Sequence, residues 1–246
     1  MSTTLDRPIM DQLRDETRGQ HDRIERTAFA AALASGRLPR EAYVESLAQL
    51  LVVHRALERH LRAAAGGGPS AHRDGGRAEP DGRGGGHCDA RVRAVVREHQ
   101  FQEANLRADL GHFGRDAEAI AAHRAALDLV EDIERTAAER PVGLLGHYYV
   151  LEGSKNGAKF LAPRVREAYR LVDGRGAAYL DPYGTEQRAR WAEFRAAMNG
   201  LDLSEGERAE ILRAAGATFT ALTRMYDGLY DAPAGEAQRA ATSNSE

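Results

Sequence analysis

Cysteine is almost absent from this chain of 246 residues, in which Cys88 is the only example. A single cysteine allows neither an intramolecular disulfide nor a cysteine-based zinc or iron–sulfur site within one chain. Long apolar runs are also missing: no stretch approaches the ~18 consecutive apolar residues of a membrane span, and the N-terminal segment has no apolar run typical of a secretory signal. These absences predict a cytoplasmic protein without a membrane span.

An excess of positive charge is missing too, since the formal net charge is −3. The chain therefore lacks the strongly basic footprint of nucleic-acid-binding proteins, and we expect no nucleic-acid partner. Lysine is confined to Lys155 and Lys159, so arginine carries nearly all the positive charge. A chain of this length can bury a sizeable core.

Alanine, leucine, arginine and glutamate dominate the sequence, and the alternation of β-branched residues typical of strands is nearly absent. This composition predicts an all-α fold. Apolar residues at helical spacing predict seven helices, over residues 9–34, 40–64, 91–110, 117–139, 142–171, 185–199 and 204–230. Pro163 lies inside the fifth of these helices and is expected to bend or break it.

The composition changes abruptly in the glycine-rich segment 66–88. This segment contains too little apolar surface to order itself, so we expect a mobile loop. Neither flank has a complete helical core by itself, which predicts one domain over residues 1–231, a single helical bundle with the loop inside it. Residues 232–246 are small and polar and are expected to fray.

The most informative segment is GHYYVLEGSKNGAKFLA, residues 146–162, which resembles one helix with Gly153 and Gly157 in its middle. Each interior glycine costs a helix about 1 kcal/mol relative to alanine. Two glycines four positions apart lie on one face and leave bare backbone there for a flat, close neighbour. A tight contact with another helix explains the pattern equally well, and spacing alone leaves both interpretations open.

An otherwise apolar helix face far upstream carries His21, with Glu25 four residues later on the same face. Glu25 can orient the imidazole and so fix which ring nitrogen meets a metal. A histidine on one helix and unshielded backbone on another can hold a planar iron cofactor, heme, between them. A partly buried histidine with a core hydrogen bond is the alternative interpretation.

Four segments, in matching order and spacing, resemble the heme oxygenases, in particular the bacterial biliverdin-producing type. They are LRDETRGQH from Leu13, LRADLG from Leu106, YYVLEGSKNG from Tyr148 and FRAAMNGL from Phe194. The segment from Tyr148 is the most specific of the four. The resemblance implies a helical bundle of the heme oxygenase type that oxidises heme with O₂ and electrons to biliverdin, CO and free iron.

The resemblance also implies a role for each matching position. His21 is expected to be the proximal ligand of the heme iron, while Gly153, Ser154 and Gly157 form the catalytic distal face. Arginine suits the propionates because its planar fork of donors matches a carboxylate. The positions implied to hold the heme are Arg14, Arg18, Tyr148 and Arg195 at the propionates, with Glu25 beside the ligand and Ala158 and Phe219 at the pocket.

The chain departs from the family pattern at Ser154 and Ala158, at Lys155 and Asn156, and in its glycine-rich insertion. Ser154 stands where many members have an aspartate that anchors a water network, and Ala158 stands where a further glycine is common. We expect Ser154 to hold the ordered water instead. The implied cofactor is heme b, which is also the substrate, with O₂ as co-substrate. The implied partners are an electron donor, such as ferredoxin or a flavin reductase, and a downstream bilin-binding protein.

Two other functions remain open on the sequence. A non-catalytic heme carrier or sensor on the same fold is suggested by the residues at Ser154, Lys155 and Ala158. Whatever the function, His54 or His147 is the alternative iron ligand if replacing His21 leaves the heme spectrum unaltered. A non-heme di-iron oxygenase, which takes imidazole and carboxylate ligands from facing helices, is the second alternative. Three His-x-x-x-Glu pairs suggest this alternative, namely His21/Glu25, His54/Glu58 and His99/Glu103.

Overall fold

The computed structural model describes residues 7–66 and 88–231. The predicted glycine-rich loop falls almost wholly on residues 67–87 and the predicted frayed tail on residues 232–246. Both therefore lie outside the described residues.

Within the described ranges the chain consists of helices and connecting turns, with no strand. The predicted all-α fold is confirmed. The α-helices are α1 (Ile9–Glu16), α2 (Arg18–Glu25), α3 (Ala28–Ala34), α4 (Arg40–Ala64), α5 (Ala90–Val95), α6 (Glu103–His112), α7 (Arg124–Glu139), α8 (Leu144–Ala168), α9 (Gln187–Asn199) and α10 (Glu205–Leu229). Three short 3₁₀ helices join them, namely η2 (Glu98–Gln100), η3 (Pro141–Gly143) and η4 (Gly184–Glu186).

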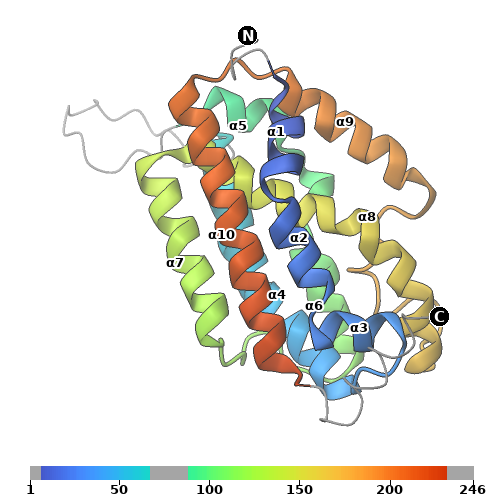
Figure 1. The fold of residues 1–246 in the computed structure, drawn as a ribbon. Helices are drawn as coiled ribbons and strands as arrows, with labels where there is room; N and C mark the ends of the chain where they lie inside the picture. Colours follow the sequence, from blue (N-terminus) through green and yellow to red (C-terminus); the bar gives the residue numbers. More distant parts are fainter. Residues whose placement is uncertain (1–6, 67–87, 232–246) are drawn as a thin grey trace, which may run out of the picture.

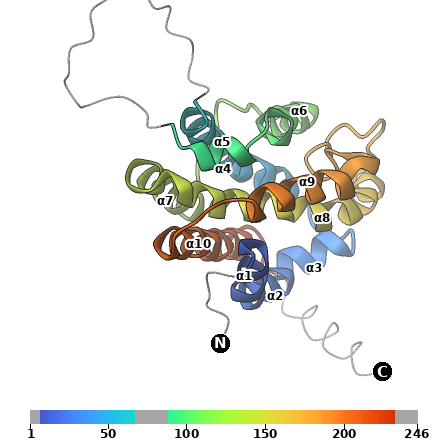
Figure 2. The same cartoon turned by 90° about the horizontal axis from the view of Figure 1, so that it is seen from above.

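The long helices α4, α8 and α10 cross the middle of the bundle, and α7 lies along one edge (Figure 1). α10 packs against α8 and α7, and α4 packs against α7 and α6. Figure 2 shows α8 lying between a layer that contains α4, α5 and α6 and a layer formed by α10 with α1, α2 and α3. None of the described helices is long and apolar enough to cross a membrane.

The helix predicted over residues 9–34 is divided into α1, α2 and α3 in the structure. Thr17 ends α1, and its hydroxyl donates to the carbonyl oxygen of Leu13 at 2.7 Å. Thr27 begins α3 by accepting a hydrogen bond from the backbone N–H of Ala30. Threonine side chains compete in this way for backbone groups and favour helix ends.

The prediction of one helix over residues 91–110 is also wrong, because the structure places α5, η2 and α6 there. The start of α6 is fixed by a side chain from another helix. Glu58 of α4 accepts hydrogen bonds from the backbone N–H groups of Gln102, at 2.6 Å, and Glu103, at 3.2 Å. A carboxylate in this position satisfies the free N–H groups of the first turn.

The helix predicted over residues 117–139 begins later, because α7 starts at Arg124. Gln49 of α4 holds the preceding segment in a non-helical form. Its amide nitrogen donates to the carbonyl oxygen of Ala121 at 3.0 Å, and its amide oxygen accepts from the backbone N–H of His123 at 2.7 Å.

Pro163 does not break the helix that contains it, since α8 continues to Ala168. A proline inside a helix removes one backbone hydrogen bond and crowds the preceding turn. Pro163 stands close to the C-terminal end of α8, so few helical residues depend on the turn that it disturbs.

Candidate functional site

A cavity of about 640 Å³ opens between α2, α3, α4, α8 and α10. We call it the α2–α8 cavity, after the two helices that carry its predicted chemical groups. Its volume lies within the range of small-molecule and cofactor sites, roughly 300–1,000 Å³. Apolar side chains form most of its wall, among them Ile24, Phe29, Leu47, Leu50, Phe219 and Leu222.

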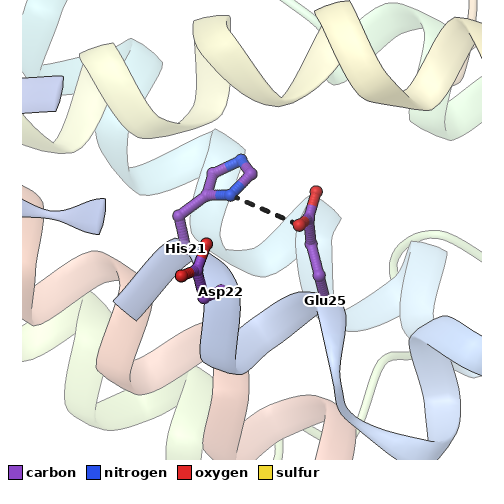
Figure 3. Close-up of side chains that lie close together, drawn as sticks. All are labelled: His21, Asp22 and Glu25. Atoms are coloured by element: carbon purple, nitrogen blue, oxygen red, sulfur yellow. Dashed lines mark ion pairs between the residues drawn. The ribbon is translucent and has the colours of Figure 1, made fainter. Parts of the chain in front are cut away.

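His21 reaches this cavity from α2. Its side chain is 54% exposed, and its Nδ1 lies 3.6 Å from a carboxylate oxygen of Glu25. Figure 3 shows both side chains rising from the same side of α2, with the imidazole directed toward the ribbon of α8. The ring also makes an edge contact with Phe219, at 5.8 Å between centroids. The Nδ1 contact leaves Nε2 as the nitrogen for a metal.

Gly153 and Gly157 of α8 line the same cavity as His21. A Cβ added at Gly157 would have no protein atom within 4 Å, and one added at Gly153 would meet only the Trp191 ring, at 3.4 Å. The backbone of α8 is therefore laid bare toward the cavity. Ser154, which also lines the cavity, donates its hydroxyl hydrogen bond to the Leu151 carbonyl oxygen at 2.8 Å. Ala158 lines the cavity as well.

Two of the predicted propionate partners, Arg14 and Arg18, lie at the cavity wall near its α1–α2 end. Both contact Asp15: Arg14 Nε lies 3.0 Å and Arg18 Nη2 lies 3.1 Å from its Oδ1. Arg7 also pairs with Asp15. Hydrogen bonds from Arg14 and Arg7 lower the pKa of Asp15 to about 2. Asp15 thus shows that this group of arginines binds a carboxylate.

The structure corrects the expectation for Tyr148. Its ring is buried on the side of α8 away from the cavity wall, and its hydroxyl donates to the side-chain oxygen of Gln100 at 2.7 Å. Tyr149 lines the cavity instead. Burial raises the pKa of Tyr149, against the opposing charges of Arg14 and Arg195. Arg195 is exposed and is not among the residues that line the cavity.

Several aromatic wall residues carried no sequence motif and were missed. Trp191 of α9 packs over Gly153 and stacks on Phe194 at 5.4 Å between centroids. Tyr179, from the turn between α8 and α9, reaches the cavity although its ring is almost wholly buried. Its position depends on a buried Asp109, whose carboxylate accepts the backbone N–H groups of Ala178 and Tyr179.

The two alternative iron ligands are held inside the core. His54 contacts Glu58 through Nδ1, at 3.0 Å, and the Tyr179 hydroxyl through Nε2, at 3.3 Å. His147 is fully buried, and its Nδ1 lies 2.8 Å from the Thr218 hydroxyl. Burial lowers the pKa of His147 to about 3. Neither imidazole has a ring nitrogen free for the cavity.

The di-iron interpretation finds no facing ligands in the described part of the chain. The one cluster there with suitable ligand atoms is His21, Asp22 and Glu25, all exposed and all on α2. Di-iron sites in helical bundles take their ligands from facing helices. The pair at His99 and Glu103 is divided between η2 and α6.

Lys155 also lies in α8 but away from the cavity wall. It is 2% exposed, and its ammonium donates to Glu152 at 2.5 Å, to the Gln100 carbonyl oxygen at 2.7 Å and to the Tyr183 hydroxyl at 2.9 Å. Burial lowers the pKa of Lys155, against the charge of Glu152. This cluster joins α8 to the segments that precede α6 and α9, which is a structural role.

A family model described as heme oxygenase matches residues 7–73 and 87–227, which is most of the chain. The chain belongs to the heme oxygenase family. No curated protein matches the chain in sequence.

Solved structures show how widely this fold is shared. The heme oxygenase of Leptospira interrogans is 19% identical over 90% of this chain and 100% of its own, with a TM-score of 0.76. Heme oxygenase-2 of Synechocystis sp. PCC 6803, in complex with heme and NO, is 24% identical over 91% and 85%, also at 0.76. A TenA homologue from P. horikoshii OT3 is 16% identical over 91% and 98%, at 0.61. These likenesses confirm the predicted heme oxygenase fold, which is also found in proteins of another kind.

Proposed function

We propose that this chain binds heme in the α2–α8 cavity and cleaves it oxidatively to biliverdin, with release of CO and iron. One observation carries the proposal: His21 and Gly157, which lie far apart in the sequence, meet on the wall of one cavity. Membership of the heme oxygenase family supports it. The fold adds little by itself, because a TenA homologue shares it.

The residues present fit a heme group in three respects. The cavity is apolar along most of its wall, as a porphyrin requires. The open space beyond Gly157 is a cradle that any larger side chain would fill. The arginines around Asp15 offer paired N–H donors to carboxylates, which are the groups that heme carries at its edge.

When bound, heme supplies the redox-active iron and is itself the molecule oxidised, with O₂ as co-substrate. His21 would hold the group through Nε2, with Glu25 at Nδ1 fixing the orientation of the imidazole. Arg14 and Arg18, which contact Asp15, would hold the propionates. The bare backbone at Gly157 allows close approach, and the apolar wall excludes bulk water.

Ser154 takes the place of the aspartate common in the family, and we propose that it holds ordered water in the cavity. Its hydroxyl is exposed toward the cavity and donates to the Leu151 carbonyl oxygen, so its oxygen remains able to accept. Ser154→Ala removes this oxygen and should lower turnover. Unchanged turnover and unchanged stability of the O₂-bound state in Ser154→Ala would reject the role.

We also propose a cytoplasmic location, with electrons from ferredoxin or a flavin reductase and a bilin-binding protein as recipient of the product. The exposed arginines Arg14 and Arg18 beside the cavity suit an acidic electron donor. Raising the sodium chloride concentration stepwise should slow electron delivery from such a donor, because salt screens the attraction between the opposite charges.

The test is hemin addition to the purified full-length chain, followed by reduction in air with ascorbate or a ferredoxin system. Loss of the heme absorption band with appearance of a bilin spectrum supports the proposal. Persistent heme under the same conditions favours a carrier or sensor on this fold. Absence of any heme absorption band, together with bound iron in metal analysis, would favour the di-iron oxygenase instead.

A further inference from the structure

A buried chain of hydrogen-bonding side chains runs from the core to the wall of the α2–α8 cavity. It begins at Glu58, which is 2% exposed, and continues through His54 to the hydroxyl of Tyr179. Tyr179 lines the cavity together with Ser154. We propose that this chain, the Glu58–His54–Tyr179 relay, stores a proton and delivers it to a basic atom in the cavity near Ser154.

Glu58 is surrounded by hydrogen-bonding groups. Its carboxylate accepts hydrogen bonds from the backbone N–H groups of Gln102 and Glu103 and also contacts Nδ1 of His54. Glu58 therefore orients the Nδ1–H of His54 and stabilises the ring when it carries a second proton, as the carboxylate does in other histidine-containing triads. Glu58 is a positioning residue.

Capping of α6 explains Glu58 but does not explain the rest of the chain. His54 lies with its ring edge-on to Tyr179, at 5.5 Å between centroids and 83° between planes. This arrangement aims Nε2 at the tyrosine oxygen. Asp109 fixes the backbone of the same tyrosine through two N–H groups. A buried carboxylate and a buried imidazole thus lead to one tyrosine that lines the cavity.

The transfer balances without any further reactant. In the charged state, His54 carries protons on both nitrogens and donates Nε2–H to the Tyr179 oxygen. When the cavity presents a base, Tyr179 gives its hydroxyl proton to that base and takes the Nε2 proton in return. His54 ends neutral with Nδ1–H directed at Glu58, and a proton from solvent in the cavity returns through the same hydroxyl to recharge the relay.

Several other charged or titratable groups of the described residues lie near the relay, with Lys155 and Tyr148 near Glu58 and Tyr43 near Tyr179. Arg62 approaches the second oxygen of Glu58 at 3.9 Å. Burial raises the pKa of Tyr179, and the neighbouring Tyr226, Glu58 and Glu152 act in the same direction. A hydroxyl that holds its proton so firmly passes protons on without remaining ionised, which suits a conductor between His54 and the cavity.

The relay rests on the proposed heme oxygenase function, and its test separates the two. Tyr179→Phe keeps the aromatic ring of the tyrosine and removes its hydroxyl. His54→Gln removes the imidazole ring of the histidine. Each variant should bind hemin as the parent chain does and lose turnover by roughly 100-fold, the scale of one general-acid contribution. Tyr169→Phe is the matched control, because its hydroxyl bonds to Leu38 and lies outside the cavity wall. It should turn over within about twofold of the parent.

Two further readouts exclude a merely structural effect. Ammonium, added as a small acid at constant ionic strength, should restore part of the turnover of Tyr179→Phe and leave the parent unchanged. In heme-free protein with ¹⁵N-labelled histidine, Tyr179→Phe should shift the Nε2 resonance of His54, whereas Tyr169→Phe should not.

Each outcome decides the question. If the parent forms no bilin, the proposed function fails and the relay fails with it. If the parent turns over and Tyr179→Phe equals it, the relay alone is wrong. Loss of turnover without ammonium rescue, or an unmoved His54 resonance in Tyr179→Phe, also overturns the relay, because both results leave Tyr179 as a packing residue.

Discussion

Substituting Gly157 by alanine should strengthen the fold and weaken heme binding at once. A Cβ at this position has no protein atom within 4 Å, so the methyl group creates no clash in the heme-free protein. A glycine-to-alanine change at a compatible helical site stabilises a protein by about 0.4–1 kcal/mol. For a protein of this size, that free energy raises Tm by about 2–4 °C at most.

The effect on heme has the opposite sign. A porphyrin in van der Waals contact with bare backbone lies about 3.5–4 Å from it. The new methyl carbon projects about 1.5 Å into that gap, so the ring must move away from α8. We expect the hemin affinity of Gly157→Ala to fall by at least about tenfold, or 1.4 kcal/mol. Gly157→Leu should lower it further.

Two other glycines serve as controls in the same assays, thermal unfolding of the heme-free protein and hemin titration. Gly111 of α6 also has no atom within 4 Å of an added Cβ and lies outside the cavity wall. Gly111→Ala should raise Tm similarly and leave hemin affinity unchanged. Gly146→Ala should destabilise, because its Cβ would lie 2.1 Å from the Ile211 carbonyl oxygen. The reasoning is refuted if Gly157→Ala lowers Tm, or if it raises Tm and binds hemin as tightly as the parent.

Three further predictions concern single side chains. His21→Ala should alter the ferric heme spectrum and abolish biliverdin formation, with activity restored by added imidazole; a parent-like spectrum would exclude His21 as ligand. Between the folded pKa of His147, about 3, and its unfolded value near 6.5, only the unfolded chain binds the proton. The free energy of unfolding should therefore fall by about 2 kcal/mol from pH 6.5 to pH 5. In His147→Gln, the free energy of unfolding measured with urea should depend less steeply on pH. Lys155→Met leaves Glu152 buried without its cation. This substitution should lower the free energy of unfolding, measured with urea, by about 3–5 kcal/mol. Adding Glu152→Gln should recover much of the lost stability. Lys159→Met is the control and should change the free energy of unfolding little. Equal losses of stability in Lys155→Met and Lys159→Met would contradict the buried pair.

The sequence allowed prediction of the all-α class, of the helical character of the segment around His21, and of α8 as one long helix. All three depend on local pattern: helical apolar spacing and paired glycines are visible over a few turns. Helix ends fixed by distant side chains were not predictable in the same way. The start of α6 depends on Glu58, and the late start of α7 depends on Gln49, both from α4.

The orientation of α8 about its own axis explains the remaining errors. Tyr148 and Tyr149 are adjacent in the sequence, so they point about 100° apart on a helix. Which one faces the cavity depends on how α8 packs between its neighbours, and the structure places Tyr149 there. The same packing buries Lys155 beside Glu152, with partners contributed by segments far away in the sequence. Tertiary contacts of this kind leave no local signal.

The most direct measurement is a crystal structure of the full-length chain with bound heme. The account predicts an Fe–Nε2 bond to His21, with the opposite face of the ring against the backbone of Gly157. A heme bound elsewhere, or a ring whose iron is held by a residue other than His21, would contradict it.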